Sequence, residues 1–372
     1  MVRKYKQYLL IGLIFFAACS PTDDSSPLPE DFFVKFYGNN SVEAGYDLLV
    51  TENGYLLFGS TNSPDLNHGG GDDSDFYLVF TDLQGNAINE VVFGTDANDI
   101  PSRIKQTSDG GYLVVGTTTL EYTIEEVDYS HTDVIVYKLD SDGAVVPSWP
   151  ITYGFAKTTP FAGEDPEDSN EAGYDIVESS DGNYVILGTT NNVRKDKDNP
   201  NPTLDKQDIY LLKITSSDAD PEHPIIWERV TGFENGNDQG RALININNGL
   251  AIMGQTNVDK DGAGTGTNII FLTTDEEGLD SQFKVFGSGD GTNEIGSKMK
   301  KTSDGGVIIV GTATSTAGNR SILMKVTASR TLTFFETMSI GELDGDGNRS
   351  ESVFINNYGY DVVELSTGGY LV

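Results

Sequence analysis

Short hydrophobic runs recur along the chain, each after a turn sequence and before a Gly. The runs are residues 55–58, 112–115, 184–187, 250–253, 307–310 and 370–372. In the second copy, Asp-Gly-Gly precedes Tyr112, and Gly116-Thr117 follows the run. Runs of aromatic, β-branched and aliphatic residues bounded by Gly, Asp and Asn predict β-strands. No stretch after residue 19 has the sustained periodicity of a helix.

Each run is followed by a second strand signature of the form Asp-x-Tyr-Leu-x-Lys or a variant of it. The copies are residues 75–80, 133–138, 208–213, 268–272 and 320–325. A short turn then leads to a strand that ends in Gly, at Gly94, Gly154, Gly232 and Gly287. With the strand that precedes each hydrophobic run, every unit has four strands, and such units in series predict the blades of a β-propeller.

The repeat therefore predicts an all-β fold, a β-propeller of six four-stranded blades. We expect blades at about residues 44–94, 98–154, 172–232, 238–287 and 293–341, and a partial blade at 357–372. Residues 32–38 also end in Gly, so we expect this strand to complete the sixth blade and close the ring, which would remove exposed strand edges. On this count the chain is truncated at its C-terminus. A larger propeller with more blades downstream is the alternative.

The N-terminus has the pattern of an export signal. Arg3, Lys4 and Lys6 precede an apolar stretch at residues 9–18 that is too short to span a membrane as a mature helix. The sequence Phe-Ala-Ala-Cys-Ser ending at Ser20 resembles the lipobox of bacterial lipoproteins, although Phe16 departs from its aliphatic preference. The resemblance implies a signal peptide at 1–18, a lipid on Cys19 and a polar, Pro-rich tether at 19–31. An ordinary signal peptide with an incidental Cys is the alternative.

The repeats as a whole resemble those of β-propeller repeat lipoproteins of Gram-negative bacteria, over residues 32–372. The resemblance implies anchoring in the outer membrane through Cys19, and Ser20 resembles the residue that sorts lipoproteins there. Asp23-Asp24 resembles the acidic tags of surface lipoproteins, so either the periplasmic or the cell-surface side is open. The repeat is specific for architecture and not for function, because propellers serve many functions.

The formal net charge of −33 argues against nucleic acid as a partner, because phosphate binding needs a basic patch. It is compatible with divalent cations or cationic partners, or with a solvated acidic surface. One loop has oxygen ligands at alternate positions, Asp344, Asp346 and Asn348, which is typical of Ca²⁺ loops. The loop departs from an EF-hand, because Ile355 stands where the final Glu would be. Ca²⁺ is the one cofactor that the sequence suggests, and a solvated turn is the alternative.

The longer connections, including residues 118–133 and 190–208, are expected on one face of the propeller, where repeat proteins usually bind their ligands. The first strand of each blade lines the central channel, and one aligned position recurs at its mouth: Asp47, Arg103, Asp175, Ala242, Lys298 and Asp361. The charged members of this ring are the predicted binding residues. A mutually satisfied ring of ion pairs is the alternative.

Three functions follow from these patterns. The first is a binding or scaffold module of the cell envelope that recognises a glycan, a peptide or a protein through its long-loop face. The second is a polysaccharide-active enzyme with carboxylates at the channel mouth. The third is a structural surface protein stabilised by Ca²⁺. We expect the protein not to be an enzyme, and no residue is predicted to be catalytic.

Overall fold

The computed structural model divides the chain into Met1–Lys35 and one compact unit, Phe36–Val372. It describes residues 34–39, 41–63, 73–124, 126–154, 169–191, 206–218, 222–233, 236–258, 266–279, 282–288, 291–316, 318–338, 341–343, 349–354 and 356–372. Cys19 and the loop residues Asp344, Asp346 and Asn348 lie outside these ranges. In the described part, no helix is long and apolar enough to cross a bilayer.

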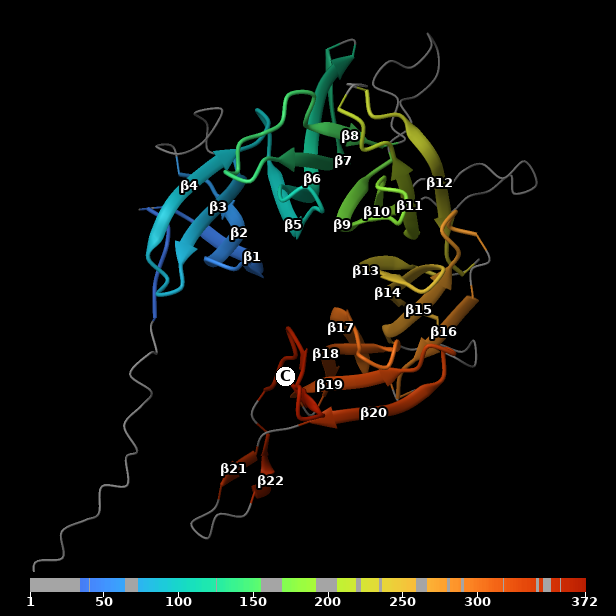
Figure 1. The fold of residues 1–372 in the computed structure, drawn as a ribbon. Helices are drawn as coiled ribbons and strands as arrows, with labels where there is room; N and C mark the ends of the chain where they lie inside the picture. Colours follow the sequence, from blue (N-terminus) through green and yellow to red (C-terminus); the bar gives the residue numbers. More distant parts are fainter. Residues whose placement is uncertain are drawn as a thin grey trace, which may run out of the picture. The chain divides into compact units, whose positions relative to one another are not determined.

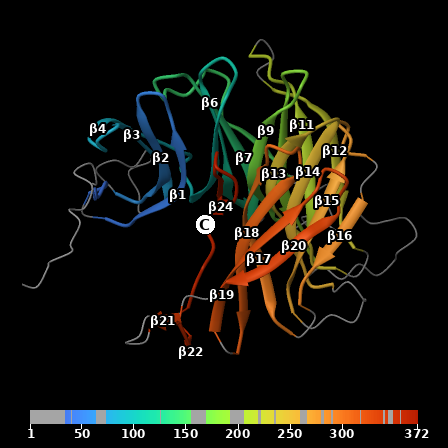
Figure 2. The same cartoon turned by 60° about the horizontal axis from the view of Figure 1, so that its bottom comes forward.

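Five four-stranded antiparallel sheets surround a common centre as the blades of a β-propeller (Figure 1). Figure 2 shows the same sheets turned by 60°. Blade one contains β1 Glu43–Val50, β2 Gly54–Thr61, β3 Asp75–Asp82 and β4 Ala87–Phe93. Blade two contains β5 Asp99–Gln106, β6 Tyr112–Ile124, β7 Val127–Leu139 and β8 Ile151–Tyr153. Blade three contains β9 Glu171–Glu178, β10 Tyr184–Thr190, β11 Asp208–Ile214 and β12 Ile225–Thr231.

The remaining blades repeat this order. Blade four contains β13 Gln239–Ile246, β14 Gly249–Thr256, β15 Asn268–Thr274 and β16 Gln282–Phe286. Blade five contains β17 Asn293–Lys301, β18 Val307–Ser315, β19 Gly318–Val326 and β20 Leu332–Met338. Two small pairs follow, β21 Gly341–Leu343 with β22 Arg349–Phe354, and β23 Val363–Glu364 with β24 Tyr370–Leu371. The predicted all-β propeller of four-stranded blades is confirmed.

The prediction of six blades is wrong, because only five four-stranded blades form in the described part of the chain. A sixth sheet is represented by two strands of two residues each, and residues 34–39 form no strand. The inner strand of blade one is less covered than those of blades two and three: Leu48 is 52% exposed, whereas the equivalent Ile104 and Ile176 are 0% exposed.

The prediction of a long loop at residues 118–133 is also wrong. These residues continue β6 and β7 as one hairpin whose register runs without a break to the pair Ile124 and Val127. The segment is rich in Thr, Tyr and Val, and residues of this kind favour extended pairing.

The core lies between neighbouring blades rather than within one of them. Between blades one and two, Phe76 is fully buried, and its ring packs edge-on against Phe58, Phe93 and Tyr137 at 5.5–5.7 Å between centroids. Such pairs add to the stabilisation from buried apolar area. Each blade therefore buries one face of the next, as expected for a repeat architecture.

The Gly-Thr signature joins one blade to the next. The Thr117 hydroxyl oxygen accepts a hydrogen bond from the Gly173 amide at 3.2 Å, and Thr189 accepts one from Gly240 at 3.2 Å. The junction between blades one and two lacks this bond. Ser60 of blade one replaces the Thr, and Pro101 of blade two, at the position of Gly173, has no N–H to donate.

The Asp of the turn before the hydrophobic run and the Lys that ends the Asp-x-Tyr-Leu-x-Lys signature form an ion pair within a blade. The Asp of the turn accepts from the Lys at the end of the third strand: Lys138 with Asp109 at 3.2 Å, Lys213 with Asp181 at 2.9 Å and Lys325 with Asp304 at 2.6 Å. Blades one and four have shorter turns without Asp, at 51–54 and 246–249, and there the Lys is replaced by Phe80 and Thr273. The two partners are present together or absent together, as expected if each is retained for the other.

Residues 356–364 dock on blade five as an inner strand would. The Gly359 amide donates to the Thr312 hydroxyl at 3.3 Å, which repeats the bond between Gly173 and Thr117. Ser303 donates from its amide and hydroxyl to the Glu364 carboxylate at 2.7 and 3.0 Å. The β23–β24 pair is therefore positioned by the same contacts that join complete blades.

Candidate functional site

A β-bulge recurs in the inner strand of all five blades. Each bulge inserts one residue between a Gly or Pro and the position predicted to line the channel; the inserted residues are Tyr46, Ser102, Tyr174, Arg241 and Ser297. A bulge re-aims the side chains beside it. The inner strands β1, β5, β9, β13 and β17 surround the centre in Figure 1, so the bulges lie around the propeller axis.

The charged residues that follow these bulges contact one another across the centre. Lys298 Nζ lies 2.9 Å from Asp47 Oδ1, and Arg103 Nη1 lies 3.5 Å from the same oxygen. Asp175 Oδ1 receives Arg103 Nε at 3.7 Å and Lys105 Nζ at 3.4 Å. We call these five residues the axial cluster. It joins blades one, two, three and five, and Ala242 occupies the equivalent position in blade four.

Both aspartates of the axial cluster are also bound by backbone amides of the following blade. Ile104 N donates to Asp47 Oδ2 at 3.3 Å, and Leu243 N donates to Asp175 Oδ2 at 2.8 Å. Burial opposes ionisation of Asp47, but Arg103, Lys298 and the amide of Ile104 outweigh it and lower the pKa of its carboxyl group. Asp47 is therefore an ionised structural anion at neutral pH.

The axial cluster has more cations than anions. Arg103, Lys105 and Lys298 face two carboxylates, which leaves a surplus of one positive charge in a chain whose formal net charge is −33. Burial and the neighbouring Arg103 lower the pKa of Lys298, and the attraction of Asp47 does not offset them. The Lys105 side chain is the most accessible of the five, 31% exposed against 3% for Asp175.

The structure brings together four of the five predicted binding residues, Asp47, Arg103, Asp175 and Lys298. The fifth, Asp361, lies apart: its side chain is 60% exposed and pairs with Lys300 at 2.7 Å. Asp361 follows in the partial sixth unit, where no complete sheet holds it against the axis. Lys105 was missed because it lies two residues beyond the aligned position, and only contact with Asp175 shows its place in the cluster.

Aromatic side chains accompany the cluster on the inner strands. The Arg241 guanidinium lies 4.8 Å from the centroid of the Tyr174 ring, a cation–π contact. In the partial sixth unit Tyr358 and Tyr360 stack at 6.1 Å, and Tyr360 is 74% exposed. The sequence signal for these positions is the residue between Gly and the aligned position, which is Tyr in three of the six copies.

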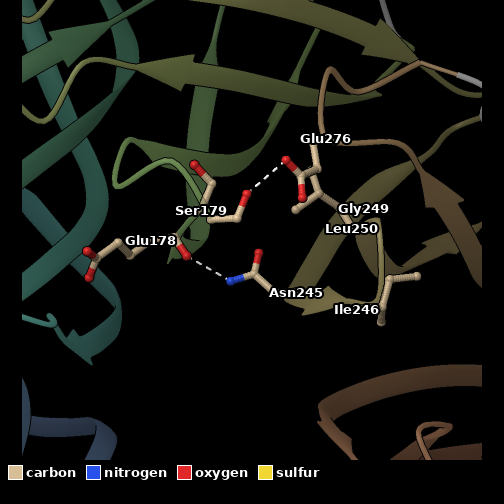
Figure 3. A pocket seen from close by; sticks show the side chains of 8 residues that line it. Glu178, Ser179, Asn245, Ile246, Gly249, Leu250 and Glu276 are labelled. Atoms are coloured by element: carbon tan, nitrogen blue, oxygen red, sulfur yellow. Dashed lines mark hydrogen bonds between the residues drawn. The ribbon is translucent and has the colours of Figure 1, made fainter.

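A separate pocket lies between blades three and four, at the opposite ends of their inner strands (Figure 3). Its volume is about 160 Å³, and Glu178 and Glu276 supply its carboxylates. Ser180 donates to Glu276 at 2.8 Å, and Ser108 donates to Glu178 from its amide and hydroxyl at 2.8 and 2.6 Å. Both acids are thus engaged in bonds between blades, and the pocket gathers no group that points to a ligand.

Neither the predicted metal loop nor the predicted lipidation site lies within the described residues. Across the ranges that the structure does describe, no group of three or more His, Cys, Asp or Glu side chains converges as a metal site. The predicted Ca²⁺ loop and the lipid on Cys19 therefore stay predictions.

Comparison with known proteins finds structural similarity at low sequence identity. A neuraminidase-like protein of A/little yellow-shouldered bat/Guatemala/060/2010 aligns with a TM-score of 0.41 and 8% identity, over 80% of this chain and 83% of that one. A mannose phosphorylase from Leishmania mexicana aligns with a TM-score of 0.34 and 10% identity, over 78% and 82%.

An endo-arabinase from Bacteroides thetaiotaomicron aligns with a TM-score of 0.36 and 12% identity, over 77% of this chain and 94% of that one. No protein-family model matches the chain. No curated protein matches it either. At these values the similarities carry no argument about activity or ligand, so the function has to be argued from the residues of the propeller itself.

Proposed function

We propose that the propeller is a binding module of the cell envelope, anchored by lipid on Cys19 to the outer membrane, that takes an anionic group of a glycan, peptide or protein at the axial cluster. The observation that carries the proposal is the surplus of cations at the axis of an acidic protein. Mass spectrometry of the mature N-terminus tests the anchor, and an unmodified Cys19 in the native host would contradict it.

An anion suits the cluster because its aspartates already have cationic partners. Each carboxylate faces cations at Oδ1 and accepts a backbone amide at Oδ2, so a cationic ligand would have to compete with the cations of the cluster. Arg103 Nε is buried and makes no hydrogen bond within the described residues. A ligand carboxylate could bind the partly exposed Lys105 ammonium without displacing either aspartate, and charge-assisted bonds of this kind are among the stronger hydrogen bonds.

The enzyme hypothesis receives less support from this geometry. General acid–base chemistry needs a carboxyl group whose pKa lies near the working pH. Asp47 has a lowered pKa and a full set of partners, so it cannot donate a proton at neutral pH. The aspartates are better suited to hold the inner strands and the cations in place.

The experiment compares an acidic with a neutral polysaccharide, polygalacturonate and dextran, by calorimetry at low and high salt. We expect binding of polygalacturonate that weakens with salt, because charged groups at a partly exposed site are screened. Lys105→Gln should weaken binding about tenfold, the effect of losing about 1.4 kcal/mol of charge-assisted bonding.

Lys284→Gln is the matched control, because this exposed lysine lies on the strand β16 of blade four. It should bind as the unmodified protein does. Equal binding of dextran and polygalacturonate, or unchanged binding by Lys105→Gln, would remove the axial cluster as the site.

A further inference from the structure

Acidic side chains gather in pairs where one blade meets the next. Each junction combines three elements: the residue at the start of the third-strand signature, the Gly after the fourth strand and an acid at or beside the start of the next inner strand. The sets are Asp75, Gly94 and Asp99; Asp133, Gly154 and Glu171; Asp208, Gly232 and Asp238; and Asn268, Gly287 and Glu294. The acids of the next inner strand are almost fully buried, from 0% to 1% exposed.

The junction between blades three and four brings two carboxylates to one glycine. A Cβ atom at Gly232 would lie 2.5 Å from Asp238 Oδ2 and 2.6 Å from Asp208 Oδ1, so both side chains converge on the space that Gly leaves open. A Cβ at Gly236 would lie 2.8 Å from Asp238 Oδ1. The two carboxylates therefore pack closely against the two glycines at this junction.

One oxygen in this site has no hydrogen-bond partner among the described residues. Asp238 is 0% exposed, and its Oδ2 accepts the Phe233 amide at 2.5 Å, but its Oδ1 accepts no hydrogen bond from the part of the chain that the structure describes. A buried carboxylate oxygen without a partner is costly, because it has lost its water and gained nothing. Burial raises the pKa of Asp238 even though hydrogen bonds from the Thr256 side chain and the Phe233 amide act in the opposite sense. Burial together with Asp238 raises the pKa of Asp208 to about 6, with Lys206 opposing the rise.

The chain supplies its own comparison at the junction between blade five and residues 356–364. There Arg320 stands where Asp208 stands, and Asn357 replaces Asp238. The acid pair has been exchanged for a cation and a neutral amide. Where two acids are retained instead, a bound cation would relieve the repulsion between the two carboxylates.

We propose that the junction between blades three and four binds a hard divalent cation, with Asp208 and Asp238 as its carboxylate ligands. Ca²⁺ fits this site better than Mg²⁺, because Ca²⁺ accepts irregular sets of carboxylate and carbonyl oxygens, whereas Mg²⁺ retains several waters in strict octahedral geometry. Bound there, the ion links the third strand of one blade to the first strand of the next.

The test is thermal unfolding of the full chain at neutral pH, in EDTA and in a series of Ca²⁺ concentrations. To separate this site from the loop at 344–348, all variants are made in a chain that also has Asp344→Asn and Asp346→Asn. We expect Ca²⁺ to raise Tm by about 3 °C or more once it is ~100-fold above its Kd. Asp208→Asn and Asp238→Asn should each abolish most of that shift.

Both substitutions are expected to fold, because the chain already has Asn268 and Asn357 at the equivalent positions of other junctions. Asp181→Asn is the control; it removes a carboxylate that pairs with Lys213 far from the junction, and the Ca²⁺ shift should persist. No shift with Ca²⁺ in the parent chain would overturn the proposal, as would a shift that survives Asp238→Asn. A Tm that responds to acid but not to Ca²⁺ would mean that a proton holds the pair.

Discussion

The axial cluster and the blade junctions both contain buried aspartates, yet the pKa of Asp47 at the axis is lowered whereas the pKa values of Asp133 and Asp208 at the junctions are raised. At the axis, Asp47 contacts Lys298 and Arg103, which outweigh burial and lower its pKa. At the junctions, Asp133 and Asp208 are partly or largely buried, and burial raises the pKa of each to about 6. The comparison shows that the partners of a buried carboxylate, rather than its burial, decide whether it is an anion at neutral pH.

The two regions also stabilise the propeller in different ways. The axial cluster links blades one, two, three and five through charges of opposite sign, so loss of one member leaves another buried and unpaired. A junction links only two neighbouring blades, and its acids repel each other unless a proton or a cation lies between them. The first region is therefore sensitive to side-chain removal and the second to solution conditions.

Removal of the central cation should have the largest effect. Arg103→Met leaves Asp47 and Asp175 with one lysine each in a largely buried site, and the Arg103 side chain is only 11% exposed. We expect the free energy of unfolding to fall by about 3 kcal/mol, the lower end for a broken buried pair because Lys298 and Lys105 remain. Urea unfolding measures it. Lys284→Met should change stability by less than about 0.5 kcal/mol, and an equally small change in Arg103→Met would show that the axial contacts do not stabilise the fold.

A change of pH should separate the two regions. The folded state holds a proton on Asp133 and on Asp208 more tightly than the unfolded state does, because their pKa values are raised to about 6. In EDTA, stability should therefore rise as the pH falls from 7 to 5, by about 1 kcal/mol for each group. The lowered pKa of Asp47 has the opposite effect on stability. The stabilisation from ionised Asp47 is present at neutral pH and is lost only as the pH falls below about 4.

Thermal unfolding between pH 3 and 8 would thus show a maximum near pH 5. In Asp208→Asn the increase in stability between pH 7 and 5 should be smaller by the contribution of one carboxyl group, about 1 kcal/mol. A Tm that stays level or declines over that interval would mean that the junction carboxylates have partners at neutral pH.

The smallest effect is expected at the exposed ion pair of a turn, which serves as the reference for both regions. Asp181 pairs with Lys213 at 2.9 Å, but its side chain is 49% exposed, so water screens the interaction. We expect Asp181→Asn to lower stability by about 0.5 kcal/mol, as for other exposed pairs. A loss as large as that of Arg103→Met would show that burial does not set the difference between the axial cluster and the turns.

Much of the fold could be predicted because its contacts repeat. Thr117 and Thr189 make the same bond to the next blade, and Lys138 and Lys213 make the same ion pair. Each contact therefore appears in the sequence as a residue type that recurs at a fixed position of the repeat. The junction acids also have a recurring sequence signal that the sequence analysis missed. It is an Asn followed by an acid, at Asn98-Asp99, Asn170-Glu171, Asn237-Asp238 and Asn293-Glu294. The hairpin of β6 and β7 has no counterpart in other blades and was mistaken for a loop.

The sequence by itself determined the four-strand unit, its alternation of turns and hydrophobic runs, and the aligned position that lines the axis. These are local features, since each depends on residues within one unit or on its nearest neighbour. Only the tertiary structure decided that five blades form, that Lys105 joins the axial cluster while Asp361 does not, and that Asp208 faces Asp238. Those outcomes depend on how far each blade turns around the axis and on which side chains then meet, and both are set by the packing of whole sheets rather than by the order of residues in any one of them.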